Sequence, residues 1–316
     1  MNKIYTHMPE EKEMREVFAE TMEELSADKK VVYLDADIIN SIKMTEFARK
    51  HPDQSVNCGI QEANMISVAA GLSAEGFIPY AHSFAPFVTR RAMDQVFMSI
   101  AYAKLNVRVI GSDPGITAGS NGGTHMPFED LSIMRSIQKS IVVEPSDSMM
   151  LKSILKQSKD IYGLTYIRLS RKKAIALYDE NDEFVIGRAK KLREGDKASL
   201  LACGLCVDDC LQAAERLSAE GIETAVYDMF TIKPIDKEAI RNAAKCGLIV
   251  TAENHNTIGG LGSAVCEVVC EQDPCRVIRL GCQDEFGEVG TMDYLKKKLG
   301  FTVDDIYNAV KRGLEK

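Results

Sequence analysis

The feature that most constrains this chain is the regular alternation of short apolar runs with longer amphipathic segments. Apolar runs of strand length alternate with stretches such as 11–26 and 62–76, in which apolar residues recur at helical spacing. This order is typical of parallel strands joined by helices and predicts an α/β fold. The expected strands lie at 31–36, 55–59, 78–83, 107–112, 140–145 and 164–169, and then at 198–204, 224–230, 248–254 and 275–281.

The length of 316 residues suggests two domains. The strand pattern is interrupted by a charged stretch, 179–197, which contains two glycines and has no helical apolar stripe. We therefore place a domain boundary in it and expect a first domain at 1–185 and a smaller second domain at 186–316. Each is expected to be a mostly parallel sheet flanked by helices.

Composition excludes several classes of function. Apolar residues make up 45% of the chain, which is enough for packed cores, and the net charge of −7 argues against a nucleic-acid partner. The apolar runs are shorter than a membrane span, and the first residues carry charge where a signal peptide would be apolar. We expect a cytoplasmic protein with no membrane partner.

The nine cysteines raise the alternatives of a metal site or disulfides. Cys203, Cys206 and Cys210 have ligand-like spacing, but they span an apolar strand and the start of a helix, where cysteine packs as a small hydrophobe. The odd number is consistent with reduced thiols. We expect no metal ligands from this chain, and the sequence does not settle whether the thiols have a redox role.

Loops that follow the strands are the first place to look for a site, because open α/β sheets bind ligands at the carboxyl ends of their strands. Each candidate there also has a purely structural explanation. Glu62 suits the first turn of a helix, Phe84 and Phe87 suit a core, and a lone loop histidine is usually a turn residue. The glycine-rich loop 113–125 implies close approach of its backbone to another group.

These features occur together in one order, and this order resembles a known family. The motifs DAD (35–37), CGIQEANM (58–65), SFAPF (83–87), GSNGGTHMPFEDLSIMR (119–135), VEPSD (143–147) and LSRKK (169–173) resemble the pyrimidine-binding half of transketolases. The second half, with TIKPID (231–236) and TAENHNTIGGLGSAV (251–265), resembles their carboxyl-terminal domain. Deoxyxylulose phosphate synthase and the beta subunits of 2-oxoacid dehydrogenases are related over the same two domains.

The resemblance implies thiamine diphosphate as cofactor. Glu62 matches the glutamate that hydrogen-bonds the aminopyrimidine ring and favours the imino tautomer, whose exocyclic nitrogen deprotonates the thiazolium carbon. Phe87 would stack on the ring with Phe84 beside it, and Asp37 is grouped with the cofactor-binding residues. We expect position 62 to be partly exposed towards the cofactor.

The resemblance also implies a set of substrate contacts. His125 matches a histidine that donates a hydrogen bond near the reacting oxygen, and Arg15, Ser41 and Arg171 match the groups that hold a sugar phosphate. Two positions depart from the family pattern. Asp113 stands where transketolases commonly have a phosphate-contacting histidine, and Asn121 stands where they have an aspartate, so the choice of ketose and aldose is left open.

Part of the family's machinery is missing from the sequence. The Gly-Asp-Gly segment and downstream Asn that hold the diphosphate through a divalent metal have no counterpart here. We therefore expect the carboxyl-terminal subunit of a split transketolase of carbohydrate and pentose phosphate metabolism. A separate N-terminal subunit would carry the diphosphate-binding domain and most of the Mg²⁺ (or Ca²⁺ or Mn²⁺) site. Two copies of each chain would form a heterotetramer, with the glycine-rich loop facing the partner.

Alternative functions are a 2-oxoacid dehydrogenase beta subunit, a deoxyxylulose-phosphate-synthase-like enzyme, and a non-catalytic scaffold or regulatory subunit. The Thr124-His125 pair and Arg171 argue against the dehydrogenase. The sequence does not identify the partner chain, or what the second domain contributes beyond assembly.

Overall fold

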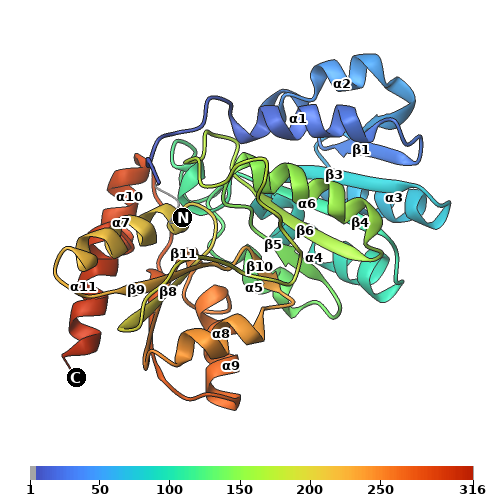
Figure 1. The fold of residues 1–316 in the computed structure, drawn as a ribbon. Helices are drawn as coiled ribbons and strands as arrows, with labels where there is room; N and C mark the ends of the chain where they lie inside the picture. Colours follow the sequence, from blue (N-terminus) through green and yellow to red (C-terminus); the bar gives the residue numbers. More distant parts are fainter. Residues whose placement is uncertain (1–4, 316) are drawn as a thin grey trace.

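The computed structural model describes residues 5–315 and contains two β-sheets flanked by helices (Figure 1). The first sheet has the strand order β10-β5-β6-β4-β3-β1-β2, and the second has the order β12-β11-β8-β9-β7. Neighbouring strands run parallel except at β10 and β7, which pair antiparallel with their neighbours. The expected two-domain α/β fold is confirmed.

The strands follow the apolar runs closely. Their bounds are β1 (Val31–Asp35), β2 (Ser55–Asn57), β3 (Ile78–Phe84), β4 (Val107–Ser112), β5 (Ile141–Val143), β6 (Leu164–Leu169), β7 (Lys190–Arg193), β8 (Ala198–Ala202), β9 (Thr224–Asp228), β10 (Thr231–Lys233), β11 (Leu248–Asn256) and β12 (Arg276–Cys282). β7 and β10 were not among the expected strands. β10 lies beyond the proposed boundary at residue 185 and still completes the edge of the first sheet.

The helices connect these strands. The α-helices are α1 (Met14–Leu25), α2 (Thr45–Lys50), α3 (Glu62–Ala74), α4 (Met93–Gln95), α5 (Asp130–Ser136), α6 (Ser148–Asp160), α7 (Cys206–Ser218), α8 (Lys237–Ala244), α9 (Leu261–Glu271), α10 (Met292–Leu299) and α11 (Val303–Leu314). Short 3₁₀ turns are η1 (Ile39–Ile42), η2 (Pro52–Gln54) and η5 (Gly115–Ala118), and π-helical turns are η3 (Phe87–Arg91) and η4 (Val96–Tyr102). Within residues 5–315, no helix is both long and apolar enough to cross a bilayer.

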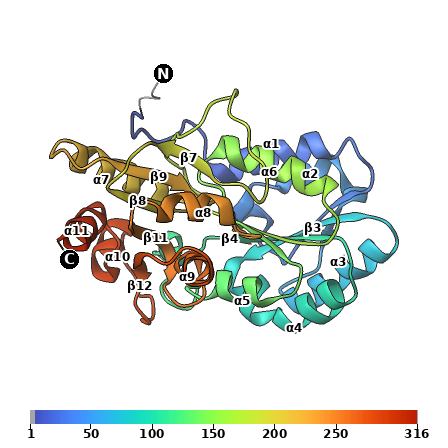
Figure 2. The same ribbon diagram turned by 60° about the horizontal axis from the view of Figure 1, so that its bottom comes forward.

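Helices cover both faces of each sheet. In the first domain α1 and α6 lie on one face, and α3, α4 and α5 lie on the other (Figure 2). Alternation along β1 explains this layering, because Val31 and Tyr33 join the core under α1, whereas Val32 and Leu34 join the core under α3. The second sheet is covered by α7 and α11 on one face and by α8 and α9 on the other.

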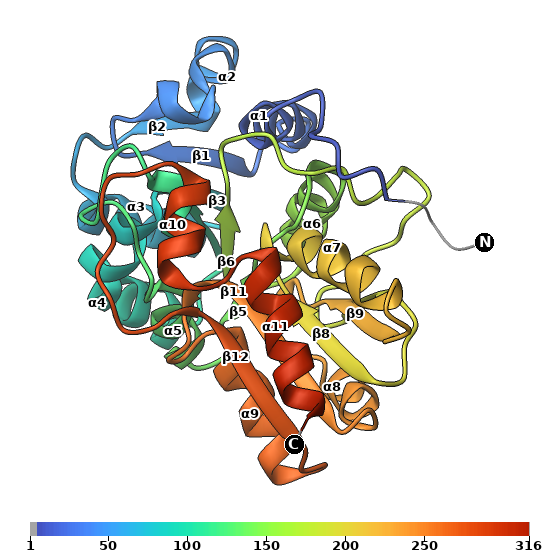
Figure 3. The ribbon, with the colours of Figure 1, turned by 90° about the vertical axis from the view of Figure 1, so that its left-hand side faces the viewer.

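The two domains share their cores. Each hydrophobic core contains buried residues from both sheets, and α10 of the second domain packs against η5 of the first (Figure 3). A buried ion network crosses the junction, in which Arg168 contacts Asp130 at 2.8 Å, Glu144 at 2.7 Å and the Asn254 carbonyl oxygen at 2.9 Å. Although burial alone would raise the pKa of Asp130, the Arg168 guanidinium lowers it. The second domain therefore holds a fixed position against the first.

Candidate functional site

Glu62 begins α3, and its carboxylate has two partners. Ser83 Oγ donates to Oε1 at 3.0 Å, and Arg91 Nη1 donates to Oε2 at 2.8 Å. Glu62 is only 2% exposed, so the expectation that this position is partly exposed is wrong. The residue lies in the first turn of the helix, where the helix dipole favours a negative charge. Burial with two donors fixes the direction of the carboxylate.

Three rings that follow the strands form a continuous surface, which we call the aromatic wall: Phe84, Phe87 and His125. The Phe84 and Phe87 centroids lie 6.1 Å apart, and the His125 centroid is 5.9 Å from Phe84 and 5.2 Å from Phe87, all in edge-to-face arrangements. Thr124 Oγ1 lies 2.9 Å from His125 Nδ1. The structure therefore brings together three residues that are up to 41 positions apart in the sequence.

An arginine lies at each end of the aromatic wall. The Arg91 guanidinium carbon is 4.0 Å from the Phe87 ring centroid, and that of Arg171 is 4.9 Å from the Phe84 centroid. Arg171 was expected in the site, whereas Arg91 and Ser83 were missed. The sequence Arg90-Arg91 does not indicate which of the two arginines enters the site, because the position of Arg91 depends on the π-helical turn η3 that carries it.

Arg15, Ser41 and Arg171 meet as expected. Arg15 Nη1 and Arg171 Nη1 both donate to the Ser41 carbonyl oxygen, at 3.2 and 3.4 Å. Arg171 also forms an ion pair with Asp113, and Arg15 forms one with Glu13 at 2.8 Å. Within the described residues, the buried Ser41 Oγ and Arg171 Nε have no hydrogen-bond partner. Two guanidiniums that converge on one carbonyl oxygen suit an anionic group of a ligand.

The glycine-rich loop 113–125 packs against the second domain. A Cβ on Gly119 would collide with the Gly290 carbonyl oxygen, and one on Gly123 would collide with that of Gly287. Asn254 accepts from the Ile116 amide at 3.0 Å and donates to the Pro114 carbonyl oxygen at 3.1 Å. The close approach implied by the glycines is therefore made by this chain's own second domain.

The two remaining candidates, Asp37 and Asn121, are both exposed. Asp37 is exposed, with a φ of 65°, and accepts from Asn57 Nδ2 at 2.9 Å. Asn121 is exposed in the glycine-rich loop and accepts from Ser120 Oγ at 3.2 Å.

An open cleft of about 750 Å³ faces the aromatic wall. It is lined by Pro86, Phe87, Arg90, Arg91, Gly123, Thr124, His125, Phe286 and Gly287. Phe286, which comes from the second domain, is 96% exposed. The cleft therefore joins the strand-end residues of the first domain to a bare apolar side chain of the second.

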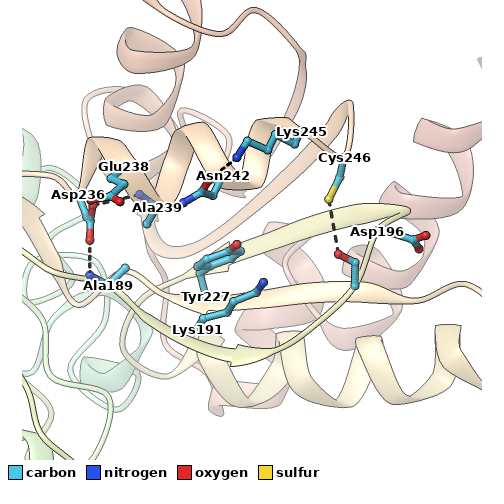
Figure 4. Close-up of a pocket in the computed structure, with 11 residues that line it drawn as sticks. Ala189, Lys191, Asp196, Tyr227, Asp236, Glu238, Ala239, Asn242, Lys245 and Cys246 are labelled. Carbon is cyan, nitrogen blue, oxygen red and sulfur yellow. Dashed lines mark hydrogen bonds between the residues drawn. The ribbon is translucent and has the colours of Figure 1, made fainter.

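A separate pocket of about 540 Å³ lies on the second domain between β7 and α8 (Figure 4). Lys191, Tyr227, Asn242 and Cys246 are among its lining residues. None of the candidates from the sequence lies there. The nine cysteines are all free thiols, with Cys203, Cys206 and Cys210 buried. Among residues 5–315, no cluster of three or more His, Cys, Asp or Glu side chains is placed to hold a metal ion.

Comparisons with known proteins match this arrangement. Residues 10–175 match the family described as "Transketolase, pyrimidine binding domain", and residues 187–306 match "Transketolase, C-terminal domain". The chain is 46% identical over 318 aligned residues to the 6-deoxy-6-sulfo-D-fructose transketolase subunit SqwH of Clostridium sp. (strain MSTE9), covering 100% of this chain and 99% of that one.

Two further proteins are similar to this chain over most of its length. An apulose-4-phosphate transketolase subunit of Phocaeicola vulgatus is 35% identical over 274 residues, with 86% of this chain and 88% of that protein covered. The solved structure titled "Split gene transketolase, inactive beta4 tetramer" superposes with a TM-score of 0.88 at 39% identity, covering 96% of this chain and 98% of that one.

Proposed function

We propose a cofactor site for this chain, which belongs to the transketolase family. In this proposal, the aromatic wall and Glu62 form the pyrimidine half of a thiamine diphosphate site. The chain is the subunit of a split transketolase that carries the pyrimidine-binding and C-terminal domains. Its activity is transfer of a two-carbon ketol unit, and it acts together with a partner subunit. The alignment with SqwH covers 100% of this chain and 99% of that one, which supports the assignment of this chain as one subunit.

One observation carries the cofactor proposal: the buried carboxylate of Glu62 and the Phe87 ring, which lines an open cleft, both contact the side chain of Arg91 and so lie close together. Glu62 would hydrogen-bond a ring nitrogen of the aminopyrimidine, and Phe87 would stack on the ring while Phe84 supports it. When bound, thiamine diphosphate supplies the nucleophilic carbon that accepts the ketol unit. The Gly-Asp-Gly segment and downstream Asn of the family have no counterpart in this sequence, so we assign the diphosphate and most of the Mg²⁺ site to the partner subunit.

The remaining candidates have roles that follow from their positions. His125 lies on the aromatic wall within the cleft, where it can donate a hydrogen bond to the reacting oxygen of a sugar. Arg15, Ser41 and Arg171 would hold the anionic tail of the sugar, with the two guanidiniums that converge on the Ser41 carbonyl oxygen as the charged donors. Asp113 orients Arg171 through its ion pair, and Asn121 and Asp37 would contact ligand or partner at the edges of the site.

The tail can be a phosphate or a sulfonate. SqwH is named for a sulfonated sugar and the Phocaeicola protein for a phosphorylated one. Both groups are tetrahedral anions that guanidinium donors bind, and a sulfonate carries less charge than a phosphate dianion. Each arginine here is already paired with a carboxylate, Arg171 with Asp113 and Arg15 with Glu13.

The partner subunit would cover the mouth of the cleft. Three apolar side chains of this region are exposed: Phe286 lines the cleft, Val289 lies against Gly122, next to the lining residue Gly123, and Ile60 is 72% exposed two residues before Glu62. Exposed apolar side chains around a functional cleft are typical of a protein interface. We propose that the assembly is a heterotetramer with two copies of this chain and two of the partner subunit.

The test is reconstitution of activity. The isolated chain with thiamine diphosphate and Mg²⁺ should transfer no ketol unit, whereas addition of the N-terminal subunit from the same source should restore transfer. Ketose donors with a phosphate, a sulfonate or an uncharged tail separate the possible substrates. Turnover by the isolated chain would refute the proposal. So would an assembled complex that oxidises pyruvate with an artificial electron acceptor and transfers no ketol unit.

A further inference from the structure

Arg91 occupies the place that the proposed function assigns to the cofactor ring. One side chain satisfies the Glu62 carboxylate at 2.8 Å and covers the face of Phe87 at 4.0 Å, which are the two contacts expected of the aminopyrimidine. A guanidinium is flat and has N–H donors at its edge, so it can imitate both contacts. We propose that Arg91 is a placeholder that keeps the pyrimidine site closed until the cofactor displaces it.

The placement of Arg91 allows it to leave. Its side chain is 49% exposed, and the described residues give its guanidinium only Glu62 and Phe87 as partners. Arg168, by contrast, is fully buried and bonded to Asp130, Glu144 and a backbone carbonyl oxygen. Removing Arg91 from its contacts requires a rotation of one surface side chain into the cleft, whereas Arg168 could not move without opening the junction between the domains.

The contact between Arg91 and Glu62 stabilises the subunit when no cofactor is bound. A buried carboxylate without a partner is costly, and Glu62 is 2% exposed. Arg91 neutralises it until a ligand arrives. The placeholder also lowers the apparent affinity for the cofactor, because only the fraction of molecules with Arg91 displaced can bind it. This inference rests on the proposed function, because it requires that the cofactor ring binds at Glu62 and Phe87.

A second arginine in the same chain provides a matched control. Arg216 is 48% exposed, donates to Asp304 at 2.6 Å and lies 4.7 Å from the centroid of the Tyr307 ring. Its carboxylate partner is 75% exposed, whereas that of Arg91 is buried. Arg91→Met and Arg216→Met therefore remove the same kind of contacts and differ in whether they leave a buried charge behind.

The first readout is the stability of the isolated subunit. Arg91→Met should lower the melting temperature clearly more than Arg216→Met, and the double variant Glu62→Gln/Arg91→Met should recover most of that loss. Equal effects of the two single variants would show that Arg91 is no counter-ion for Glu62. If Arg91→Met fails to fold, Arg91→Gln, which retains one donor for the carboxylate, replaces it.

The second readout is cofactor binding to the assembled complex, titrated calorimetrically with thiamine diphosphate in excess Mg²⁺. Arg91→Met should bind about tenfold more tightly than the wild type, which is the factor expected from losing one charge-assisted competing contact. Arg216→Met should bind like the wild type. Unchanged or weaker binding by Arg91→Met would overturn the placeholder. Absence of binding by the wild-type complex would instead refute the proposed function, whatever the stability comparison shows.

Discussion

Replacement of Glu62 by glutamine separates the chemistry of the carboxyl group from its structural role. Glutamine has the same shape, so its carbonyl oxygen can still accept from Ser83 Oγ, now 3.0 Å from Oε1. The neutral amide removes the negative charge of the carboxylate, whose Oε2 atom accepts from Arg91 Nη1 at 2.8 Å. Loss of one charge-assisted hydrogen bond predicts a decrease of about 1–3 kcal/mol in the free energy of unfolding. Alanine would cost more, because the buried Ser83 hydroxyl would lose its acceptor and a cavity would form.

The expected loss of activity is larger than the loss of stability. A side chain that moves a proton in the reaction contributes about 10²–10⁴-fold to the rate. An amide cannot exchange a proton with a ring nitrogen as a carboxyl group does. Ketol transfer by the assembled Glu62→Gln enzyme should therefore fall by about two to four orders of magnitude at saturating cofactor.

The assay compares steady-state ketol transfer with unfolding in urea for the same preparations. Glu253→Gln is a matched control, because Glu253 is also a fully buried glutamate and accepts from the Leu261 and Gly262 amides at 2.7 and 2.8 Å. It should lose stability and retain activity. A rate for Glu62→Gln within a few fold of the wild-type rate, with cofactor bound, would refute the reasoning.

Two further predictions follow from the tail-binding residues and from the domain junction. Arg171→Ala should raise KM for sugars with an anionic tail more than for uncharged sugars, because it removes one of the two guanidiniums that would bind the tail; equal effects in steady-state kinetics would contradict it. Burial raises the pKa of Asp228 to about 7, so the folded chain holds a proton that the unfolded chain has released. The contribution of Asp228 to the free energy of unfolding should therefore be largest below about pH 4 and should decrease by up to about 4 kcal/mol between pH 4 and 7. Asp228→Asn should flatten this dependence in urea titrations from pH 5 to 8.5, and an unchanged slope would exclude Asp228 as its source.

The central strands, such as β4 and β6, were predictable because their apolar runs are buried on both faces. The bounds of β4 and β6 agree with the predicted strands at 107–112 and 164–169. The two strands that were missed, β7 and β10, are edge strands of four and three residues with lysines in them. Short charged segments carry no apolar pattern, and their pairing is decided by the neighbouring strand. Local sequence therefore could not place them.

The candidate site was predictable where it depends on strand ends. Glu62, Phe84, Phe87 and His125 follow strands of one parallel sheet, so their meeting at one edge follows from topology. The burial of Glu62 and the contact with Arg91 were not predictable in this way. They depend on the π-helical turn η3 and on the rotamer of one arginine, which no periodicity in the sequence records.

The second domain has a part in the site that the sequence did not reveal. Asp113, Asn121 and His125 all lie on the glycine-rich loop, and that loop is shaped by the Gly287 and Gly290 backbone and by Asn254. Because the two domains share their cores and the buried Arg168 network, separating them would expose apolar surface and unpaired charges. The aromatic wall, in contrast, faces an open cleft that is lined by the exposed side chain of Phe286. Separating the C-terminal domain from the pyrimidine-binding domain would therefore leave the glycine-rich loop without the backbone and the asparagine side chain that pack against it.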